Sequence, residues 1–483
     1  MGGPRPNRQA IILRYAQKWA SGYRPLVPAR NVPASVGVYM AFSIVTTTGG
    51  VAVRSETRHL RLRTGLAAGL VLALSGLAAC SGPAAPPAAP PTTSSVPAPT
   101  TEPPPPILAS KLVLSPGKTA NIAPGDDVTA ELVNGTLDTV KLTGPGNTSV
   151  AGAFSATKGT WTATKVLAYN TAYTLTASGI GADGQKHTAT RAFTTAKARL
   201  FTMPSLWSYD WIDLKEGGTY GVGQVIVVRF DENIKDKANA ERNLIVTTDP
   251  PVQGAWRWMD DSTVHFRPRD YWPAGTKVKV TARVQGKNLG NGIFGQASPS
   301  VSFKIGKSKI AIADSRTHRM TVYIDGQLVT KINGKDVTAG IPISMGKNSG
   351  EHSPAGWIDF RTASGPHVVL NKFEVKRMTS ASYGITNPSS PNYYDERIAK
   401  AVRISGSGEY VHLADWNIPQ HGKENTSHGC INVAPTYIYW FYNQFNAGDV
   451  VDVRNTGRQL ELRDGLGDWT ISWDRWVKGS ALQ

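Results

Sequence analysis

Short runs of alternating polar and apolar residues, with turn residues about every 8–12 positions, constrain the fold of this chain most strongly. Two runs lie in blocks that resemble each other: WTATKVLAYNTAYTLTA begins at Trp161 and FRPRDYWPAGTKVKVTA begins at Phe266. Their starts are 105 residues apart, the size of one sandwich domain. A period of two predicts antiparallel strands. We therefore expect two Ig-like β-sandwiches, at residues 107–198 and 199–305; a single larger β domain is the alternative.

A different order of strands follows residue 306. The segment SKIAIADSRTHRMTVYIDGQLVTKI alternates in the same way and carries Asp325-Gly326 between two strand-like runs, which predicts a hairpin. GWIDFRT, HVVLNKF, EYVHLADW and DVVDVRN are further strand-like runs. We expect a mainly β chain with a few short helices, in which a third β-rich domain occupies residues 306–455.

One helix is expected in APTYIYWFYNQFNAGD, with Pro435 in its first turn and a stop at residues 446–448. Its buried face should contain Trp440, Phe441 and Phe445. The last part, residues 456–483, has three tryptophans within eight positions and no periodicity. We expect it to pack as an irregular cap against the preceding domain.

The N-terminal part carries much of the positive charge. Of the formal net charge of +17, residues 1–79 contribute +9, because ten Lys or Arg face the single acid Glu56, and the remainder carries +8. A moderately basic surface suits nucleic acid, an anionic cell wall or a membrane. The chain has no basic run or stacking-aromatic motif typical of nucleic-acid binding, so we expect no nucleic-acid partner.

A secretory signal is expected within residues 1–79. Three arginines of RHLRLR precede the uncharged apolar run from Gly65 to Ala79, which is too short for a comfortable membrane span. The run ends in LAA followed by Cys80 and resembles the signal of bacterial lipoproteins. That resemblance implies diacylation of Cys80 as the mature N-terminus; an ordinary signal peptide with an incidental cysteine is the alternative.

Two further expectations concern the residues around this signal. Residues 1–52 precede the charged region, so we expect a misassigned start, with the true one near Met40, Val51 or Val53. Residues 80–106 are almost entirely Pro, Ala, Thr and Ser after the cysteine, which predicts an extended, lipid-anchored linker. At about 3.1 Å per residue, it would hold the following domains several nanometres from the membrane.

Cys430 is the second of only two cysteines and lies in NTSHGCINVAP, residues 425–435. With Cys80 lipidated, Cys430 has no disulfide partner, and an unpaired exported thiol is a liability unless it is used. A buried small hydrophobe is the alternative, but Ser427, His428 and Gly429 are polar or flexible neighbours. The helix expected a few residues later should favour the thiolate. These features predict a nucleophile.

A thiol nucleophile needs a base, and three histidines lie nearby. His412 lies on an expected strand, whereas His421 and His428 lie in or beside the loop PQHGKENTS. The fixed position of His412 favours it as the base. A zinc site of three histidines and one cysteine is the competing arrangement, but His428 and Cys430 are closer together than common structural zinc spacings. We therefore expect no metal and no cofactor.

HLADWNIPQHGKENTSHGCINV resembles the signature of L,D-transpeptidases, in which a histidine precedes Ser-His-Gly-Cys by about fourteen to seventeen residues. Here fourteen residues separate His412 from Ser427. The resemblance covers residues 306–455 and the Trp-rich tail, and the complete order is similar to mycobacterial and other actinobacterial members. Leu413 departs from the smaller residue that relatives often have, although its backbone carbonyl is the group that orients the imidazole in the family.

The resemblance implies a thioester mechanism on peptidoglycan. Cys430 would attack the diaminopimelate carbonyl of a tetrapeptide stem, His412 would transfer protons, D-alanine would leave, and a neighbouring diaminopimelate amine would complete a 3→3 cross-link. Implied oxyanion and supporting residues are Ser427, His428, Gly429 and the lid tyrosine Tyr394. Implied substrate-binding residues are Tyr394, Tyr383, Ser407, Gly408, Asn432 and Trp416.

The implied partners are peptidoglycan stem peptides, β-lactams such as carbapenems as covalent inhibitors, and the membrane through the lipid anchor. The expected location is the outer face of the plasma membrane, with the third domain in the cell wall. Two alternatives stay open: an L,D-carboxypeptidase with water as acceptor, and a non-catalytic wall-binding lipoprotein.

Overall fold

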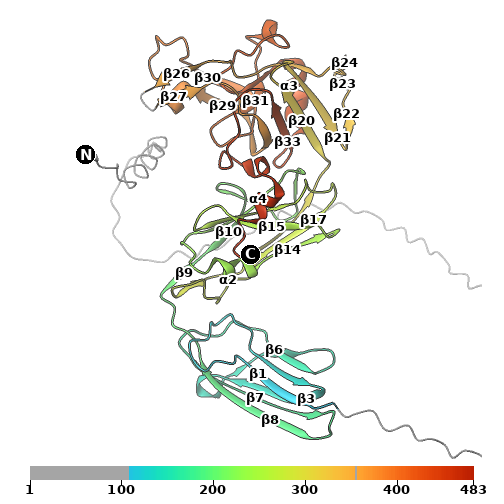
Figure 1. The fold of residues 1–483 in the computed structure, drawn as a ribbon, viewed down its shortest axis with the longest axis vertical. Coiled ribbons are helices and arrows are strands. Elements are labelled where there is room, and N and C mark those ends of the chain that lie inside the picture. Colours follow the sequence, from blue (N-terminus) through green and yellow to red (C-terminus); the bar gives the residue numbers. More distant parts are fainter. Residues whose placement is uncertain (1–107, 354–355) are drawn as a thin grey trace, which may run out of the picture. The chain divides into compact units, whose positions relative to one another are not determined.

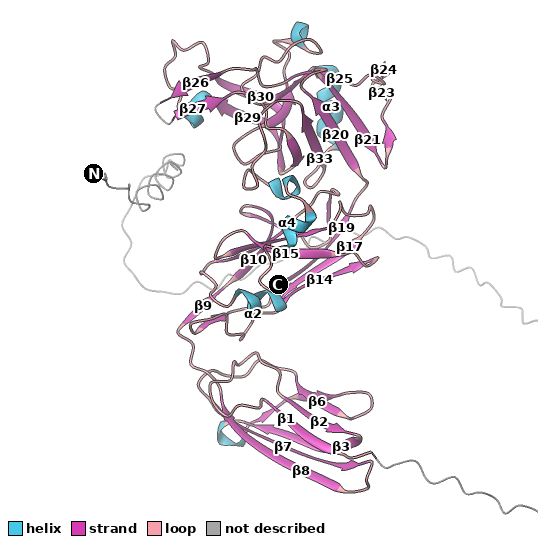
Figure 2. Ribbon diagram, viewed as in Figure 1, coloured by secondary structure: helices cyan, strands magenta, loops and turns pink. Residues whose placement is uncertain are grey.

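The computed structural model describes residues 108–353 and 356–483. The expected signal, Cys80 and the linker therefore lie outside the described residues. Within these ranges the chain is mostly strand (Figure 2), and its α-helices are α2, α3 and α4. No helix among the described residues is long and apolar enough to cross a bilayer.

The first sandwich contains two four-stranded sheets, in the orders β1-β2-β6-β5 and β4-β3-β7-β8 (Figure 1). Alternate side chains of β7 are buried, which matches the expected period of two. Trp161, Leu175 and Phe193 contribute to its core. The strands are β1 (Lys111–Ser115), β2 (Thr129–Val133), β3 (Gly135–Thr143), β4 (Ser149–Val150), β5 (Gly152–Phe154), β6 (Thr160–Ala163), β7 (Ala172–Gly181) and β8 (Lys186–Thr194).

The second sandwich pairs a five-stranded sheet, β11-β10-β13-β16-β15, with a four-stranded sheet, β12-β19-β17-β14. Phe230 and Trp272 lie in its core, and β9 pairs with β18 beside it. Its elements are β9 (Leu200–Thr202), β10 (Pro204–Tyr209), β11 (Ile212–Asp213), β12 (Gly218–Tyr220), β13 (Ile226–Phe230), α2 (Lys237–Arg242), β14 (Leu244–Asp249), β15 (Gly254–Trp258), β16 (Thr263–Pro268), β17 (Lys277–Ala282), β18 (Ile293–Gly295) and β19 (Ser300–Ile305).

The third domain is built on a ten-stranded sheet, in the order β28-β33-β20-β21-β25-β32-β31-β30-β29, with β22 paired to β21. Asp325 and Gly326 both have positive φ in the β21–β22 turn, so the expected hairpin is confirmed. The strands are β20 (Lys309–Asp314), β21 (Arg319–Ile324), β22 (Gln327–Leu328), β23 (Lys331–Ile332), β24 (Lys335–Asp336), β25 (Ile341–Ser344), β26 (Gly350–Ser353), β27 (Gly356–Asp359), β28 (Gly365–Val368), β29 (Asn371–Thr379), β30 (Asp395–Arg403), β31 (Tyr410–Leu413), β32 (Ile431–Val433) and β33 (Val450–Arg454).

The expected helix is α3 (Pro435–Gln444), which begins at Pro435 as the sequence predicts. Ile438, Phe441 and Tyr442 are its buried residues, and Phe445, just beyond its end, is also buried. Trp440 is only partly buried, so the expected buried face was partly wrong. The helix ends before residues 446–448 because Phe445 already has extended backbone angles.

The C-terminal tail is less irregular and more widely connected than expected. It contains a 3₁₀ turn (Gly467–Thr470) and the helix α4 (Trp473–Val477). The Asp464 carboxylate accepts hydrogen bonds from the N–H and hydroxyl of Ser407 in the third domain. Trp476 is fully buried and its indole N–H donates to Ala255 of the second sandwich. The tail therefore packs against both domains, and the expectation of a cap on the third domain alone was incomplete.

Candidate functional site

Strand register places the candidate nucleophile and base on one face of the large sheet. β31 and β32 are parallel neighbours, with Val411 opposite Ile431 and His412 opposite Asn432. Val411 and Ile431 are fully buried in the core of the third domain. Successive side chains of a strand point to opposite faces, so His412 and Asn432 lie on the face opposite Val411 and Ile431. Cys430, two residues before Asn432, is on the same side as Asn432.

This face forms one wall of a cavity of about 620 Å³. Cys430, His412 and Asn432 all line it, which brings together residues that the sequence separates by up to twenty positions. Met378, Tyr394 and Ile398 contribute from the β29–β30 side, and loop residues close the other side. The complete lining is Met378, Tyr394, Glu396, Ile398, His412, Trp416, Asn417, Gln420, Glu424, Thr426, Ser427, His428, Cys430 and Asn432.

The Cys430 thiol is neutral in this resting geometry. Its sulfur lies 4.0 Å from the carbonyl oxygen of Gly408, to which the thiol donates. Burial is the main cause that raises the pKa of Cys430 to about 12; the Tyr410 backbone hydrogen bond lowers this pKa and negative charge on Glu409 raises it. The expectation of a thiolate favoured by a following helix was therefore wrong. Strand β32 separates Cys430 from the first residue of α3, so the helix dipole does not offset desolvation.

His412 is held as a neutral imidazole with one free nitrogen. Its Nδ1 lies 2.7 Å from the carbonyl oxygen of Leu413 and donates to it, which leaves Nε2 as the acceptor. The resemblance implied this contact at Leu413, the residue that differs from the smaller one often found in relatives. Burial lowers the pKa of His412 to about 4. Trp416 stacks on the ring, with centroids 6.0 Å apart, and also lines the cavity.

Residues 427–430 form a tight turn before β32, which we call the catalytic turn. The Ser427 hydroxyl donates to the Cys430 carbonyl oxygen at 2.6 Å and accepts from the Gly429 N–H at 3.2 Å. Gly429 has φ of +125°, a conformation that other residues rarely adopt. These contacts fix the backbone around the thiol.

His428 and the two tyrosines form an aromatic group beside the catalytic turn. Tyr394 and His428 line the cavity, with ring centroids 5.2 Å apart. Burial raises the pKa of Tyr394 to about 12, so its phenol stays protonated and able to donate. Tyr383 lies behind Tyr394, 6.1 Å between centroids, and does not line the cavity. The structure therefore favours Tyr394 over Tyr383 for contact with a bound ligand.

Ser407 and Gly408 differ in what they present to the thiol. The Ser407 N–H and hydroxyl both donate to Asp464, at 2.5 and 2.7 Å, so this hydroxyl is already engaged. The Gly408 carbonyl instead faces the Cys430 sulfur. Neither residue belongs to the cavity lining. Their side of the site is positioned by the C-terminal tail, a contact that the sequence pattern did not reveal.

Two groups near the thiol were missed from the sequence. Lys347 donates to Asn392 at 2.5 Å, and Asn392 donates to Glu351 at 2.6 Å, which ties the β26–β27 hairpin to the segment before Tyr394. Glu409 is 4% exposed and lies against Gly429. An acidic residue three positions before His412 was the visible signal for Glu409; nothing in the sequence indicated the lysine contact.

The other histidine near the site has a structural partner. His421 is buried and its Nε2 contacts the Asn417 amide oxygen at 2.9 Å. Across residues 108–353 and 356–483, no group of three or more His, Cys, Asp or Glu side chains has an arrangement suited to a metal ion.

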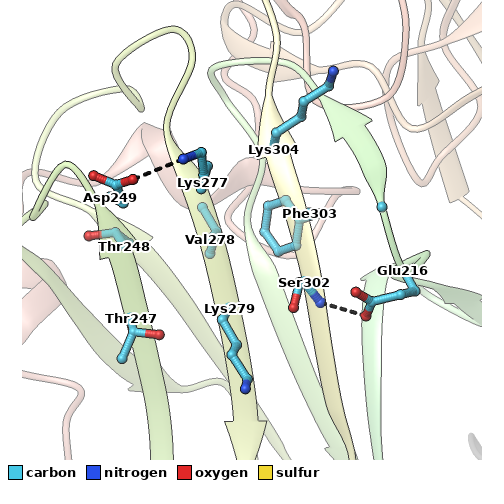
Figure 3. A pocket seen from close by; sticks show the side chains of 11 residues that line it. Glu216, Thr247, Thr248, Asp249, Lys277, Val278, Lys279, Ser302, Phe303 and Lys304 are labelled. Carbon is cyan, nitrogen blue, oxygen red and sulfur yellow. Dashed lines mark hydrogen bonds and ion pairs between the residues drawn. The ribbon is translucent and has the colours of Figure 1, made fainter. Parts of the chain in front are cut away.

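A second depression, of about 470 Å³, lies on the β14-β17-β19 face of the second sandwich (Figure 3). Lys277 and Asp249 pair there at 3.1 Å, and Glu216 accepts from the backbone N–H of Ser302 at 2.8 Å. The ammonium groups of Lys279 and Lys304 point in different directions. Its lining contains neither histidine nor cysteine.

Comparison with known proteins agrees with this fold. A model of the L,D-transpeptidase catalytic domain matches residues 308–453, and one of the bacterial Ig domain matches residues 119–288. L,D-transpeptidase 2 of Mycobacterium tuberculosis (strain CDC 1551 / Oshkosh) is 37% identical over 379 residues, which cover 76% of this chain and 86% of that protein. L,D-transpeptidase 5 of M. tuberculosis (strain ATCC 25618 / H37Rv) is 33% identical, with coverages of 77% and 78%.

A solved structure of L,D-transpeptidase 3 from M. tuberculosis with a faropenem-derived adduct is 31% identical, covers 52% of this chain and 98% of that one, and superposes with a TM-score of 0.40. The sequence relationships extend over most of the described domains. The chain belongs to the L,D-transpeptidase family, an enzyme family of peptidoglycan cross-linking.

Proposed function

We propose that this protein is a cysteine-dependent peptidoglycan L,D-transpeptidase that forms 3→3 cross-links. The observation that carries the proposal is the placement of Cys430 and His412 on one wall of a single cavity, with the His412 Nδ1–H committed to Leu413. In this mechanism the neutral thiol gives its proton to the neutral imidazole that lines the same cavity as the sulfur attacks. The resting state thus avoids a buried ion pair.

The first half-reaction makes a thioester. The Cys430 sulfur attacks the diaminopimelate carbonyl of a tetrapeptide stem while its proton passes to His412 Nε2. The carbonyl becomes an oxyanion, for which the His428 and Cys430 N–H groups and the Tyr394 hydroxyl are candidate donors. The Gly429 N–H already donates to Ser427. His412 then protonates the nitrogen of D-alanine, the peptide bond breaks, and the stem stays on sulfur as an acyl group.

The second half-reaction transfers that acyl group. A diaminopimelate amine of a neighbouring stem attacks the thioester, gives its proton to His412, and expels the thiolate, which takes the proton back. The broken peptide bond supplies the energy, so no nucleotide enters. The cavity carries two exposed carboxylates at its lining, Glu396 and Glu424, which suit the approach of an ammonium group.

The same thiol chemistry extends to β-lactams, because attack on the strained amide would leave a stable acyl group on Cys430. We also propose that the protein acts at the outer face of the plasma membrane, held by lipid on Cys80. The charge pattern and LAA-Cys motif of residues 58–80 support that location.

Incubation of the full chain with donor and acceptor stems, followed by mass spectrometry of the products, tests the proposal. The wild type should release D-alanine and form cross-linked dimers. Incubation with a carbapenem should increase the mass of the Cys430 peptide by the mass of one carbapenem molecule. Cys430→Ala and His412→Gln should lose both products. Release of D-alanine without dimers would instead establish an L,D-carboxypeptidase, and full activity of either variant would overturn the assignment.

A further inference from the structure

Glu409 is a buried carboxyl that the proposed mechanism leaves unused. It is 4% exposed and directly precedes β31, the strand of His412. Its Oε1 accepts from the backbone N–H of Ala363 at 2.9 Å and from the Arg458 guanidinium at 3.1 Å. Its Oε2 is buried and has no hydrogen-bond partner among the described residues. Burying such an oxygen is unfavourable unless a proton or a cation compensates it.

His367, on β28, supplies a group able to share that proton. It is fully buried, and its Nε2 lies 3.8 Å from Glu409 Oε2. Its Nε2 also lies 2.8 Å from the Ala363 carbonyl oxygen, and its Nδ1 lies 3.1 Å from that of Ile404. A neutral imidazole carries only one N–H donor, whereas hydrogen bonds to both carbonyl oxygens require two. The two carbonyls favour a second proton, whereas burial lowers the pKa of His367. The extra proton is therefore assigned to the Glu409–His367 pair rather than to the ring alone.

Both placements of this proton leave the pair neutral overall. With the proton on the carboxyl, Glu409 and His367 are uncharged; with it on the ring, the two form an ion pair. Burial raises the pKa of Glu409 to about 8, so the pair keeps its proton at neutral pH and loses it in mildly alkaline solution. The loss adds one negative charge beneath the catalytic turn.

Contacts connect this charge to the thiol. A methyl group built on Gly429 would lie 3.7 Å from both Glu409 Cγ and Oε1, so the carboxyl packs directly against the catalytic turn. The residue before Glu409 presents its carbonyl to the Cys430 sulfur, and the Tyr410 backbone after it hydrogen-bonds to that sulfur. A carboxylate here raises the pKa of Cys430.

The other charged groups around Glu409 are few and opposed. Arg458 favours the carboxylate, whereas Asp464 and Asp359 raise the pKa of Glu409 by repulsion. Asp359 is itself paired with Arg361 at 2.7 Å. Asp464 accepts from Ser407.

We propose that Glu409 and His367 are positioning residues that share one proton beneath the catalytic turn, and that this proton controls how readily Cys430 becomes a thiolate. The inference rests on the proposed function in taking Cys430 as the nucleophile. It adds a pH-dependent effect on the nucleophile. As pH rises and the pair loses its proton, the new negative charge opposes ionisation of the Cys430 sulfur.

The test follows alkylation of Cys430 by iodoacetamide in the full chain between pH 6 and 10, with peptide mapping to separate Cys430 from Cys80. In the wild type, the logarithm of the rate should rise with pH, flatten between about pH 8 and 9 as the pair loses its proton, and then rise again with unit slope. In Glu409→Gln, which keeps the shape but cannot lose a proton, the rise should continue with unit slope. The variant should therefore react about ten-fold faster at pH 10, the effect of about one pKa unit.

Glu241→Gln is the matched control, because Glu241 is also 4% exposed and hydrogen-bonded, but lies in the second sandwich. It should keep the wild-type profile, and a shift as large as that of Glu409→Gln would overturn the proposal. Superimposable profiles of Glu409→Gln and wild type would overturn it as well. If near-ultraviolet circular dichroism shows Glu409→Gln unfolded, Arg458→Met replaces it: without the cation the pair holds its proton more tightly, and the flattening should move to higher pH.

Alkylation needs neither peptidoglycan nor transfer. If Glu409→Gln alters the pH profile of alkylation but the wild type makes no cross-links, the proposed function is refuted and this inference stands. If the wild type makes cross-links but Glu409→Gln has an unaltered profile, this inference is refuted and the proposed function stands.

Discussion

At the scale of single residues, burial decides the protonation states of the site. Desolvation penalises charge, so it raises the pKa of Cys430 and lowers that of His412 and His428 to about 4. The thiol and the imidazole are therefore both neutral at pH 7. The Leu413 carbonyl adds orientation, because it leaves only Nε2 free to receive a proton.

These histidines predict a loss of stability in acid. Their folded-state pKa of about 4 lies below the ordinary value of 6.5. The unfolded chain therefore binds protons first, and stability present above pH 6.5 is lost as pH falls through 4. Urea denaturation at pH 7.5 and at pH 5 should show this decrease, and His412→Gln should reduce it. The exposed His352→Gln is the control and should behave as wild type; an equal decrease in His412→Gln would contradict the prediction.

At the scale of elements, two short strands and one turn build the site. The parallel pairing of β31 with β32 sets which face His412 and Asn432 share. The catalytic turn lies just before β32, with Gly429 in a backbone conformation that few residues adopt. The site thus depends on backbone geometry as much as on its reactive side chains.

Gly429→Ala tests this dependence. The added methyl would have room, since its nearest neighbours lie 3.7 Å away, so the strain comes from φ of +125° alone. We expect a stability loss of about 1–3 kcal/mol and strongly slowed carbapenem acylation, measured by thermal unfolding and intact-protein mass. Gly326→Ala, at positive φ in the distant β21–β22 turn, should lose stability but keep acylation. Equal acylation by both variants would argue against a geometric role.

At the scale of the whole described chain, the tail joins the second sandwich to the third domain. The guanidinium of Arg267 lies 4.6 Å from the ring centroids of both Trp469 and Trp476 and 5.6 Å from that of Trp473. His265 contacts Asp468 at 2.7 Å beside them. Because Asp464 in the same tail holds Ser407, this packing continues to the loop beside Cys430.

Arg267→Ala should therefore weaken more than one domain. Loss of the stacking and of the hydrogen bond to Ile471 should lower stability by about 2–4 kcal/mol. Denaturation followed by tryptophan fluorescence should show the loss, together with slower acylation at Cys430. Arg283→Ala, exposed on the same sandwich, should change stability by no more than about 0.5 kcal/mol. Unchanged acylation in Arg267→Ala would show that the tail does not support the site.

Local signals in the sequence identified the strands, the β21–β22 hairpin, the start of α3 and the pair Cys430 and His412. Each depends on neighbours in the chain: alternation, an Asp-Gly turn, a proline in the first helical turn, and residue types at a fixed spacing. The buried face of α3 was less accessible, because which of its aromatic residues is buried depends on the sheet that it packs against.

By itself, the sequence determined that the chain is mainly β, and it singled out Cys430 as the candidate nucleophile and His412 as its candidate base. Only the tertiary structure decided that the thiol is neutral at rest, that Ser407 is bound to Asp464 of the tail, and that Glu409 and His367 lie together beneath the catalytic turn. The physical reason is that protonation and hydrogen bonding depend on desolvation and on contacts between residues far apart in sequence, and these exist only once the sheet and tail have packed.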